Sequence, residues 1–324
     1  MGAMRKVILR RDRFVNPFNE PARDLRVFNK PLWLHQRDSL AHFTTEEREA
    51  ADLSAIPADG VESLVHADNL WFDEGFLAHF MSRARAAGGP CRAAIPADDR
   101  AFVQHALPLS DSYCRDGDLY YADLWYFPRG VEPGAPVKPV VIPFEPREIG
   151  YYHIPSYMAK EQGDLVFQVP VHSAIAIDHW VHIFIADCVF GLFGRVRRVE
   201  DQLVNDALFK LRILWRALYE QKQVLSSSKL VKVGRNCVID PTAVIHGPTA
   251  IGDNCNIGAG VVIQNCEIGS HVNISEGCQL MLSTVGDGCF LPFRAALFMT
   301  TLMENTMVAQ NTCLQMCVVG RDTF

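Results

Sequence analysis

A six-residue repeat in the last third of the chain constrains the fold more than any other feature of the sequence. Sixteen aliphatic anchors follow one another at steps of six residues, with four steps of five that set a 17-residue period. An α-helix needs apolar spacings of three and four, whereas short strands joined by corners accommodate a step of six. Three hexads per turn predict a triangular parallel β-solenoid over residues 230–324. The anchors are Val233, Ile239, Ile245, Ile251, Ile257, Ile263, Ile268, Ile274, Leu280, Val285, Leu291, Leu297, Leu302, Val308, Leu314 and Val319.

Small residues stand four places after most anchors, which indicates an interior position where side-chain size is restricted. Cys255, Cys278 and Cys289 occupy this position. No Cys-x-x-Cys motif occurs among the 10 cysteines, so we expect these thiols to pack as small apolar groups rather than bind metal. Glycine follows several anchors, as at Gly234 and Gly252, where a turn conformation without a Cβ clash is easiest.

The segment Ile251-Gly-Asp-Asn-Cys-Asn-Ile257-Gly-Ala-Gly-Val-Val-Ile263 resembles the hexapeptide-repeat family, whose members form left-handed parallel β-helices. The resemblance covers residues 231–324, or about five coils. The sequence stops one hexad into a new coil, and no polar cap follows. Because solenoids need a cap at each end, we expect this β-helix to be incomplete at its carboxyl-terminal end, as part of a longer protein or covered by a partner.

The resemblance also implies a chemistry. Hexapeptide-repeat proteins are mostly acyltransferases that take the acyl group from acyl-CoA or acyl-carrier protein, with a histidine as general base and the active site between subunits of a trimer. Histidine suits this role because its ordinary pKa, near 6.5, lets it accept a proton at neutral pH. His271 and His246 are the two histidines of the solenoid and the candidate catalytic residues. A homotrimer also agrees with the sparse charge of the solenoid.

The amino-terminal part, residues 1–170, alternates predicted strands and helices, which indicates an α/β domain. We expect a strand at Val7–Leu9 and helices over residues 33–43 and 44–53. A further strand begins at Ser63 and ends in an acidic loop, and residues 74–87 form the next predicted helix.

Two short motifs in this part look like those of sugar nucleotidyltransferases, the enzymes to which hexapeptide tails are often joined. Asn29-Lys30-Pro-Leu-Trp is similar to their Gly-Lys-Pro helix start, and Val65-His-Ala-Asp68 to the strand end whose aspartate binds magnesium. The resemblance implies that Asp68 binds a magnesium ion and that Lys30 lies near the nucleotide. The alternative for Asp68 is a cap of its own loop.

This part departs from that family where the phosphates bind. Nucleotidyltransferases hold phosphates on a glycine-rich loop, but residues 3–59 contain no glycine. Arg23 and Arg26 are the candidate phosphate ligands that remain, because guanidinium groups make bidentate contacts with phosphate. The sequence therefore predicts a degenerate nucleotidyltransferase-like domain.

Residues 171–229 form a predicted helical connector. Leu203, Ala207, Leu211, Leu214 and Leu218 share one face of an amphipathic helix that is locally basic. Packing of this face against the first solenoid coil is the expected role, because that coil would otherwise expose Val233 and Ile239. Peripheral contact with a membrane surface is the alternative.

Composition narrows the function further. The formal net charge of -6 argues against a nucleic-acid partner, and no secretory signal precedes Arg13, so we expect a cytoplasmic protein. The sequence favours a transferase that moves an acyl group to a nucleotide-linked sugar or another carbohydrate. A non-catalytic β-helical assembly protein and a working, magnesium-dependent sugar nucleotidyltransferase are the alternatives.

Overall fold

The computed structural model describes residues 4–131, 134–154 and 163–324. The chain divides into two compact units, each of which is described by itself. The sheet unit consists of Met1–Leu25 and Lys30–His182. The solenoid unit consists of Arg26–Asn29 and Ile183–Phe324. The four-residue segment Arg26–Asn29 thus belongs to the solenoid unit although its neighbours in the chain belong to the sheet unit.

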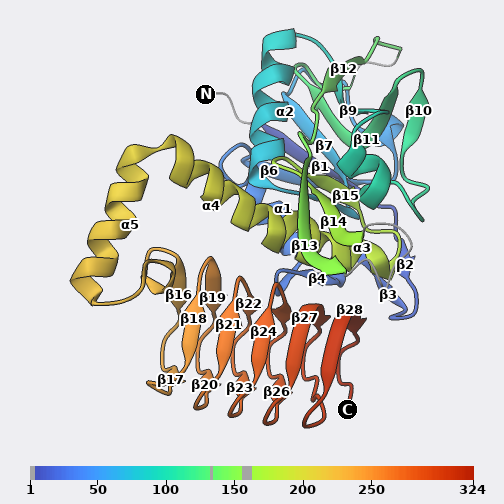
Figure 1. Ribbon diagram of the computed structural model, residues 1–324. Helices are drawn as coiled ribbons and strands as arrows, with labels where there is room; N and C mark the ends of the chain where they lie inside the picture. The colour runs from blue at the N-terminus through green and yellow to red at the C-terminus, as the bar shows by residue number, and fades with distance from the viewer. Residues whose placement is uncertain (1–3, 132–133, 155–162) are drawn as a thin grey trace. The chain divides into compact units, whose positions relative to one another are not determined.

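The sheet unit is built on a mixed β-sheet (Figure 1). Its strand order is β12-β9-β11-β7-β1-β6, and β10 pairs with β11. Strands β6, β1 and β7 are parallel, whereas β11 runs antiparallel to both β7 and β9. The strands are β1 (Arg5–Leu9), β6 (Glu46–Ala50), β7 (Ser63–Ala67), β9 (Cys91–Pro96), β10 (Cys114–Asp116), β11 (Leu119–Phe127) and β12 (Lys138–Val141).

Two helices of the sheet unit confirm the sequence prediction. Helix α1 (Leu32–Leu40) follows the lysine-proline pair, and α2 (Glu74–Ala87) follows the loop after β8. Asp73 caps α2 by accepting a hydrogen bond from the Phe76 backbone N–H at 2.7 Å. The helix ends at Gly88, whose φ of 66° is left-handed.

Smaller elements complete the sheet unit. They are β2 (Phe14–Val15), β3 (Glu20–Pro21), η1 (Ala22–Asp24), β5 (Lys30–Pro31), η2 (Leu53–Ala55), β8 (Leu70–Phe72), η3 (Phe102–Ala106), β13 (Arg147–Ile154), β14 (Gly163–Val169), β15 (Ala174–Ala176) and the first three residues of α3 (Trp180–Phe184). Strand β8 pairs with β15, and β13 pairs with β14.

The predicted helix over residues 44–53 is wrong. Strand β6 occupies this segment and forms the parallel edge of the sheet beside β1. Lys6 lies within 2.5 Å of Glu47, and Arg5 within 3.3 Å of Glu46. The hydrogen-bonding edge of β1 needs a partner strand, and this requirement outweighs the local helical preference of a glutamate-rich segment.

The solenoid unit begins with β4 (Arg26–Val27) and a helical connector, and its coils follow. The connector consists of η4 (Ile185–Phe193), α4 (Gly194–Asn205), α5 (Ala207–Glu220) and η5 (Val224–Ser226). The expected packing of the α5 apolar face on the first coil is wrong, because only Ile213 and Ala217 of α5 are buried and Val233 remains 47% exposed. Among the described residues no helix is both long and apolar enough to cross a membrane.

The coils form a left-handed parallel β-helix whose strands stack at the predicted period (Figure 1). Ile239 pairs with Ile257, Ile257 with Ile274, and Ile274 with Leu291 on successive coils, as the anchor pattern requires. The strands are β16 (Val231–Val233), β17 (Val238–Ile239), β18 (Val244–His246), β19 (Thr249–Ile251), β20 (Asn256–Ile257), β21 (Val262–Gln264), β22 (Glu267–Ile268), β23 (Asn273–Ile274), β24 (Gln279–Met281), β25 (Thr284–Val285), β26 (Phe290–Leu291), β27 (Ala296–Leu302) and β28 (Cys313–Val319).

The interior of the β-helix matches the prediction for the small positions. Cys255, Cys278 and Cys289 are at most 2% exposed and belong to one apolar core with the anchors. The reason for the glycines differs from the expected one. Gly252 does not have a left-handed φ; instead, a Cβ there would lie 2.6 Å from the carbonyl carbon of Gly269 on the next coil. Close approach of neighbouring coils therefore requires this glycine.

Candidate functional site

The carboxyl ends of β1 and β7 lie side by side at one edge of the sheet. The strands are parallel and in register, with Leu9 opposite Ala67. The chain continues from β1 into Arg10, Arg11 and Arg13, and from β7 into Asp68. Ligands of α/β proteins bind at this kind of edge, so three arginines stand where the glycine-rich loop of a nucleotidyltransferase would be.

Asp68 holds the loop after β1. Its side chain is buried, and its Oδ1 accepts a hydrogen bond from the Arg11 backbone N–H at 3.0 Å. Its Oδ2 lies 3.2 Å from the Arg10 Nε. Burial raises the pKa of the Asp68 carboxyl, while the Arg11 N–H and the Arg10 charge oppose that shift. Both oxygens thus have partners within the protein, and these partners lie on the loop after β1 rather than on the loop that Asp68 itself begins.

Asp123 on β11 binds two arginines at the same edge, Arg11 and Arg92. Arg92 Nη2 donates a hydrogen bond to its Oδ1 at 2.8 Å, and Arg11 donates a short hydrogen bond to its Oδ2. The Arg92 guanidinium also lies 4.8 Å from the centroid of the Trp125 ring. A half-buried arginine stacked on an aromatic ring is held in one orientation, which favours recognition of a fixed anionic group.

A polar groove of about 260 Å³ opens over these residues. Its lining combines three guanidinium groups with a serine, a tyrosine and two carboxylates, and phosphate oxygens are ligands that arginine and serine bind well. The lining residues are Arg11, Arg13, Arg92, Asp111, Ser112, Tyr113, Cys114 and Asp123. We refer to this site as the arginine groove.

Asp178 fixes one wall of the arginine groove. It accepts hydrogen bonds from Ser110 Oγ at 2.5 Å, Ser112 Oγ at 2.9 Å and Asn69 Nδ2 at 2.8 Å. Arg13 Nε lies 3.4 Å from its Oδ1. Since these partners come from three separate segments of the chain, Asp178 positions the loop that carries Ser112.

The structure does not bring the predicted nucleotide ligands into this groove. Lys30 Nζ lies 2.9 Å from Asp38 on α1, and Arg23 pairs with Glu49 at 3.3 Å. Arg26 belongs to the solenoid unit. Its guanidinium lies 2.6 Å from Asp287 and 2.6 Å from Glu304, two carboxylates of adjacent coils. Their proposed roles toward a nucleotide stay predictions.

Sequence reasoning missed the arginines that do converge. The available signal was the run Arg10-Arg11-Asp-Arg13 immediately after the first predicted strand, where an α/β fold places its ligand loop. Arg92 and Asp123 carried no local signal, because nothing in their neighbourhoods indicates that they meet.

No group of three or more His, Cys, Asp or Glu side chains that could hold a metal ion occurs in the described part of the chain. The magnesium ion that the nucleotidyltransferase resemblance implies would find in Asp68 a carboxylate whose two oxygens already have partners. The described residues therefore offer no ready ligand set for magnesium, and the role of Asp68 as a metal ligand stays a prediction.

His271 lies at an exposed corner of the β-helix, where each coil needs a left-handed residue. Its φ is 59°, and its Nε2 lies 3.4 Å from the Asn254 Nδ2. Asparagine, glycine and aspartate fill this corner on the other coils, so His271 stands in a ladder in which asparagine is the commonest residue. The ladder residues are Asn236, Asn254, His271, Gly288, Asn305 and Asp322, with φ values from 54° to 71°.

His246 lies elsewhere on the solenoid. It ends β18 and pairs with Gln264 of the next coil. Its backbone carbonyl accepts a hydrogen bond from Thr249 Oγ1 at 2.5 Å, and its ring Nε2 is buried without a hydrogen-bond partner among the described residues. The two histidines thus occupy different structural positions, and only His271 is exposed.

Comparison with known proteins supports the repeat. Residues 231–265 match the family model described as "Bacterial transferase hexapeptide (six repeats)". A protein named "Bifunctional protein GlmU" from Syntrophomonas wolfei is 33% identical over 146 residues, which is 43% of this chain and 32% of that protein. The protein of the same name from Geotalea uraniireducens is 32% identical over 100 residues, which is 31% of this chain and 22% of that protein.

These matches are partial. The chain covers between about a fifth and a third of the length of these two relatives. The 146-residue match is longer than the solenoid, so it extends into the part of the chain that precedes the repeat. Residues 231–265 of the left-handed β-helix therefore carry a hexapeptide repeat, and the chain is similar over less than half of its length to proteins named "Bifunctional protein GlmU".

Proposed function

We propose that the chain is a hexapeptide-repeat transferase that moves an acyl group from acyl-CoA or acyl-carrier protein to a nucleotide-linked sugar or another carbohydrate. The observation that carries this proposal is the left-handed β-helix with His271 exposed at a corner beside Asn254. These donors and acceptors are cytoplasmic metabolites, so the proposal includes a cytoplasmic location.

In the proposed reaction, the His271 imidazole takes the proton of the acceptor hydroxyl or amine. The freed oxygen or nitrogen attacks the thioester carbonyl and forms the new C–O or C–N bond, and the C–S bond breaks. The imidazolium then returns its proton to the leaving thiolate. An imidazole serves both steps because its ordinary pKa lies near neutral pH. Asn254 orients the ring through its side-chain amide, 3.4 Å from Nε2.

A homotrimer belongs to the same proposal. His271 is exposed at a corner, so a neighbouring subunit would supply the other side of the acceptor site. Only 11 of the 94 residues from Val231 to Phe324 are Asp, Glu, Lys or Arg, and Phe293 is 48% exposed. Both features favour an interface between subunits that covers this surface. Light scattering should report about three times the chain mass.

The decisive variant is His271→Asn. Asparagine is the commonest residue of this corner ladder, so the variant should keep the left-handed turn and lose only the imidazole. We expect thiol release from acetyl-CoA or longer acyl-CoAs, with UDP-sugars as acceptors, to fall by about 10²- to 10⁴-fold. His246→Asn is the matched control and should retain activity. Full activity in His271→Asn would refute the assignment, and inactive wild-type protein would favour a non-catalytic assembly protein.

A second candidate function is supported by the arginine groove, which fits the phosphates of a sugar nucleotide. UDP-sugars and nucleoside triphosphates should raise the melting temperature of the protein, because a ligand that binds only the folded state stabilises it. Arg92→Gln should abolish the shift. Release of pyrophosphate from a nucleoside triphosphate and a sugar phosphate, lost in Asp68→Asn, would promote the sugar nucleotidyltransferase alternative. Absence of any shift would leave the groove without a nucleotide function.

A further inference from the structure

Helix α5 presents a wide apolar face to solvent. Ile213 and Ala217 are its buried side chains, and the helix contacts α4 and η5 of the same unit. Six large apolar side chains of the helix remain between 48% and 76% exposed. They are Leu208, Leu211, Leu214, Trp215, Leu218 and Tyr219. A soluble surface does not normally gather so many large apolar groups on one short helix.

The exposed face lies opposite the attached face. Successive residues turn by about 100° around a helix, so Trp215 lies about 180° from the midpoint between Ile213 and Ala217. Leu211 and Leu208 flank Trp215 on its two sides. The helix thus packs within its own unit through a narrow stripe, and its broader and more apolar side is exposed to solvent.

The charges around this face are positive. Arg212 and Lys210 border the apolar stripe, and Lys229 follows shortly after the helix. None of these three forms an ion pair within the described ranges of the chain. The single acidic side chain of α5, Glu220, is engaged instead: its Oε1 accepts a hydrogen bond from Arg216 Nε at 2.7 Å, and its Oε2 accepts one from the Ser228 backbone N–H at 2.9 Å.

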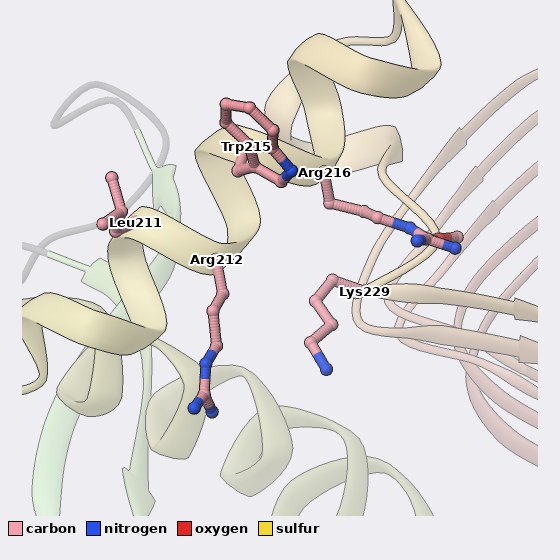
Figure 2. A pocket seen from close by; sticks show the side chains of 6 residues that line it. Leu211, Arg212, Trp215, Arg216 and Lys229 are labelled. Atoms are coloured by element: carbon pink, nitrogen blue, oxygen red, sulfur yellow. The ribbon is translucent and has the colours of Figure 1, made fainter.

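An open groove of about 890 Å³ borders the stripe and joins its apolar and basic parts. Figure 2 shows Trp215 and Leu211 projecting from the helix, while the Arg212 and Lys229 side chains extend to a common side. An apolar groove edged by two cationic groups is complementary to a surface that offers acyl chains and phosphates together.

We propose that α5 is an interfacial helix that binds an anionic lipid surface. The Leu208, Leu211, Trp215 and Leu218 side chains would enter the boundary between headgroups and acyl chains, and Arg212 and Lys229 would contact lipid phosphates. A second copy of the chain fits less well. Two such faces would bring cations against cations, since the exposed side of α5 carries no carboxylate for them.

The test is sedimentation of the full chain with phosphatidylcholine vesicles, with and without phosphatidylglycerol. We expect binding only to the vesicles that contain phosphatidylglycerol, and weaker binding at high salt. Leu211→Asp combined with Leu218→Asp should reduce the affinity at least about tenfold, because each exposed leucine contributes apolar burial. Arg212→Gln combined with Lys229→Gln should reduce it about thirtyfold.

Two control variants test whether vesicle binding depends on α5 and whether Trp215 reports it. Phe14→Ser removes an aromatic residue that is 56% exposed from the sheet unit, and this variant should bind vesicles as the wild type does. Trp215→Phe should still bind but lose most of the blue shift in tryptophan fluorescence. Equal binding to neutral vesicles, no binding, or a loss of molecular mass in the variant that combines Leu211→Asp with Leu218→Asp would each overturn the proposal. The last outcome would assign the face to a second copy of the chain.

Discussion

The solenoid and the edge of the sheet hold their polar side chains in different ways. In the β-helix, Asn254 meets His271 17 residues away, and Asn305 meets Asp322 at the same separation. At the sheet edge, Arg11 contacts Asp68 across 57 residues and Asp123 across 112. A substitution in the solenoid therefore acts through the two adjacent coils, whereas one at the sheet edge disturbs segments that are far apart in the chain.

The largest effect should come from the middle of the solenoid. The Leu291 side chain is fully buried, so Leu291→Ala leaves a cavity in the core of the β-helix. We expect a loss of about 3 kcal/mol in the free energy of unfolding. Val233→Ala truncates an anchor of the first coil that is 47% exposed, and should cost less than about 1 kcal/mol. Urea unfolding measures both. Equal losses would contradict the stacking of anchors in one continuous core.

Close approach of the coils gives the next effect. Gly252→Ala would place a Cβ 2.6 Å from the backbone of Gly269, so the coils must separate, and we expect a loss of about 2 kcal/mol. Gly89→Ala is the matched control. A Cβ at Gly89 meets nothing within 4 Å, so the free energy of unfolding of the Gly89→Ala protein should change by less than about 0.5 kcal/mol. A neutral Gly252→Ala would show that the coils are more loosely stacked.

The two units should respond to pH in opposite directions. In the sheet unit, burial lowers the pKa of His66 to about 4. Because the folded state holds the neutral imidazole, this stability is present above about pH 6.5 and is lost as the pH falls toward 4. The loss approaches about 1.4 kcal/mol per pH unit in that window. Hydrogen exchange of β7 amides would measure it, and His66→Phe should flatten the profile.

In the solenoid unit, Asp187 acts in the other direction. Burial raises its pKa to about 7, while its carboxyl accepts hydrogen bonds from the Phe28 backbone N–H at 2.7 Å and Thr301 Oγ1 at 2.8 Å. The folded state favours the protonated form, so this stability is present at low pH and is lost as the pH rises through 7. Asp187→Asn should remove that dependence from β27 amides. If the stability of both units changed in the same direction with pH, the predicted difference between them would be wrong.

The smallest expected effect is the difference in stability between two variants of the corner residue His271. His271→Val places a β-branched residue at a φ of 59°, and we expect a loss of about 1 kcal/mol. His271→Asn should stay within about 0.5 kcal/mol of the wild type, since asparagine tolerates this conformation. Thermal unfolding of the two proteins compares them directly. A destabilised His271→Asn would mean that the imidazole, rather than the left-handed turn, matters for folding.

The sequence was sufficient for the β-helix because its tertiary contacts repeat along the chain. Each anchor packs on the anchors 17 or 18 residues away, so a one-dimensional period already contains the three-dimensional core. The repeat also identified the inward cysteines, and the local apolar pattern identified helices α1 and α2. It failed for β6, where the requirement of β1 for a pairing partner lies outside any local pattern.

Only the tertiary structure decided which polar residues meet and which apolar residues stay exposed. Arg92 and Asp123 come together with Arg11 because three strands end or pass at one edge of the sheet, an arrangement with no periodic trace in the sequence. Helix α5 shows the same limit. Its amphipathic period was evident, but a period gives two faces without saying which one packs, and here the structure buries Ile213 and Ala217 and leaves Trp215 in solvent.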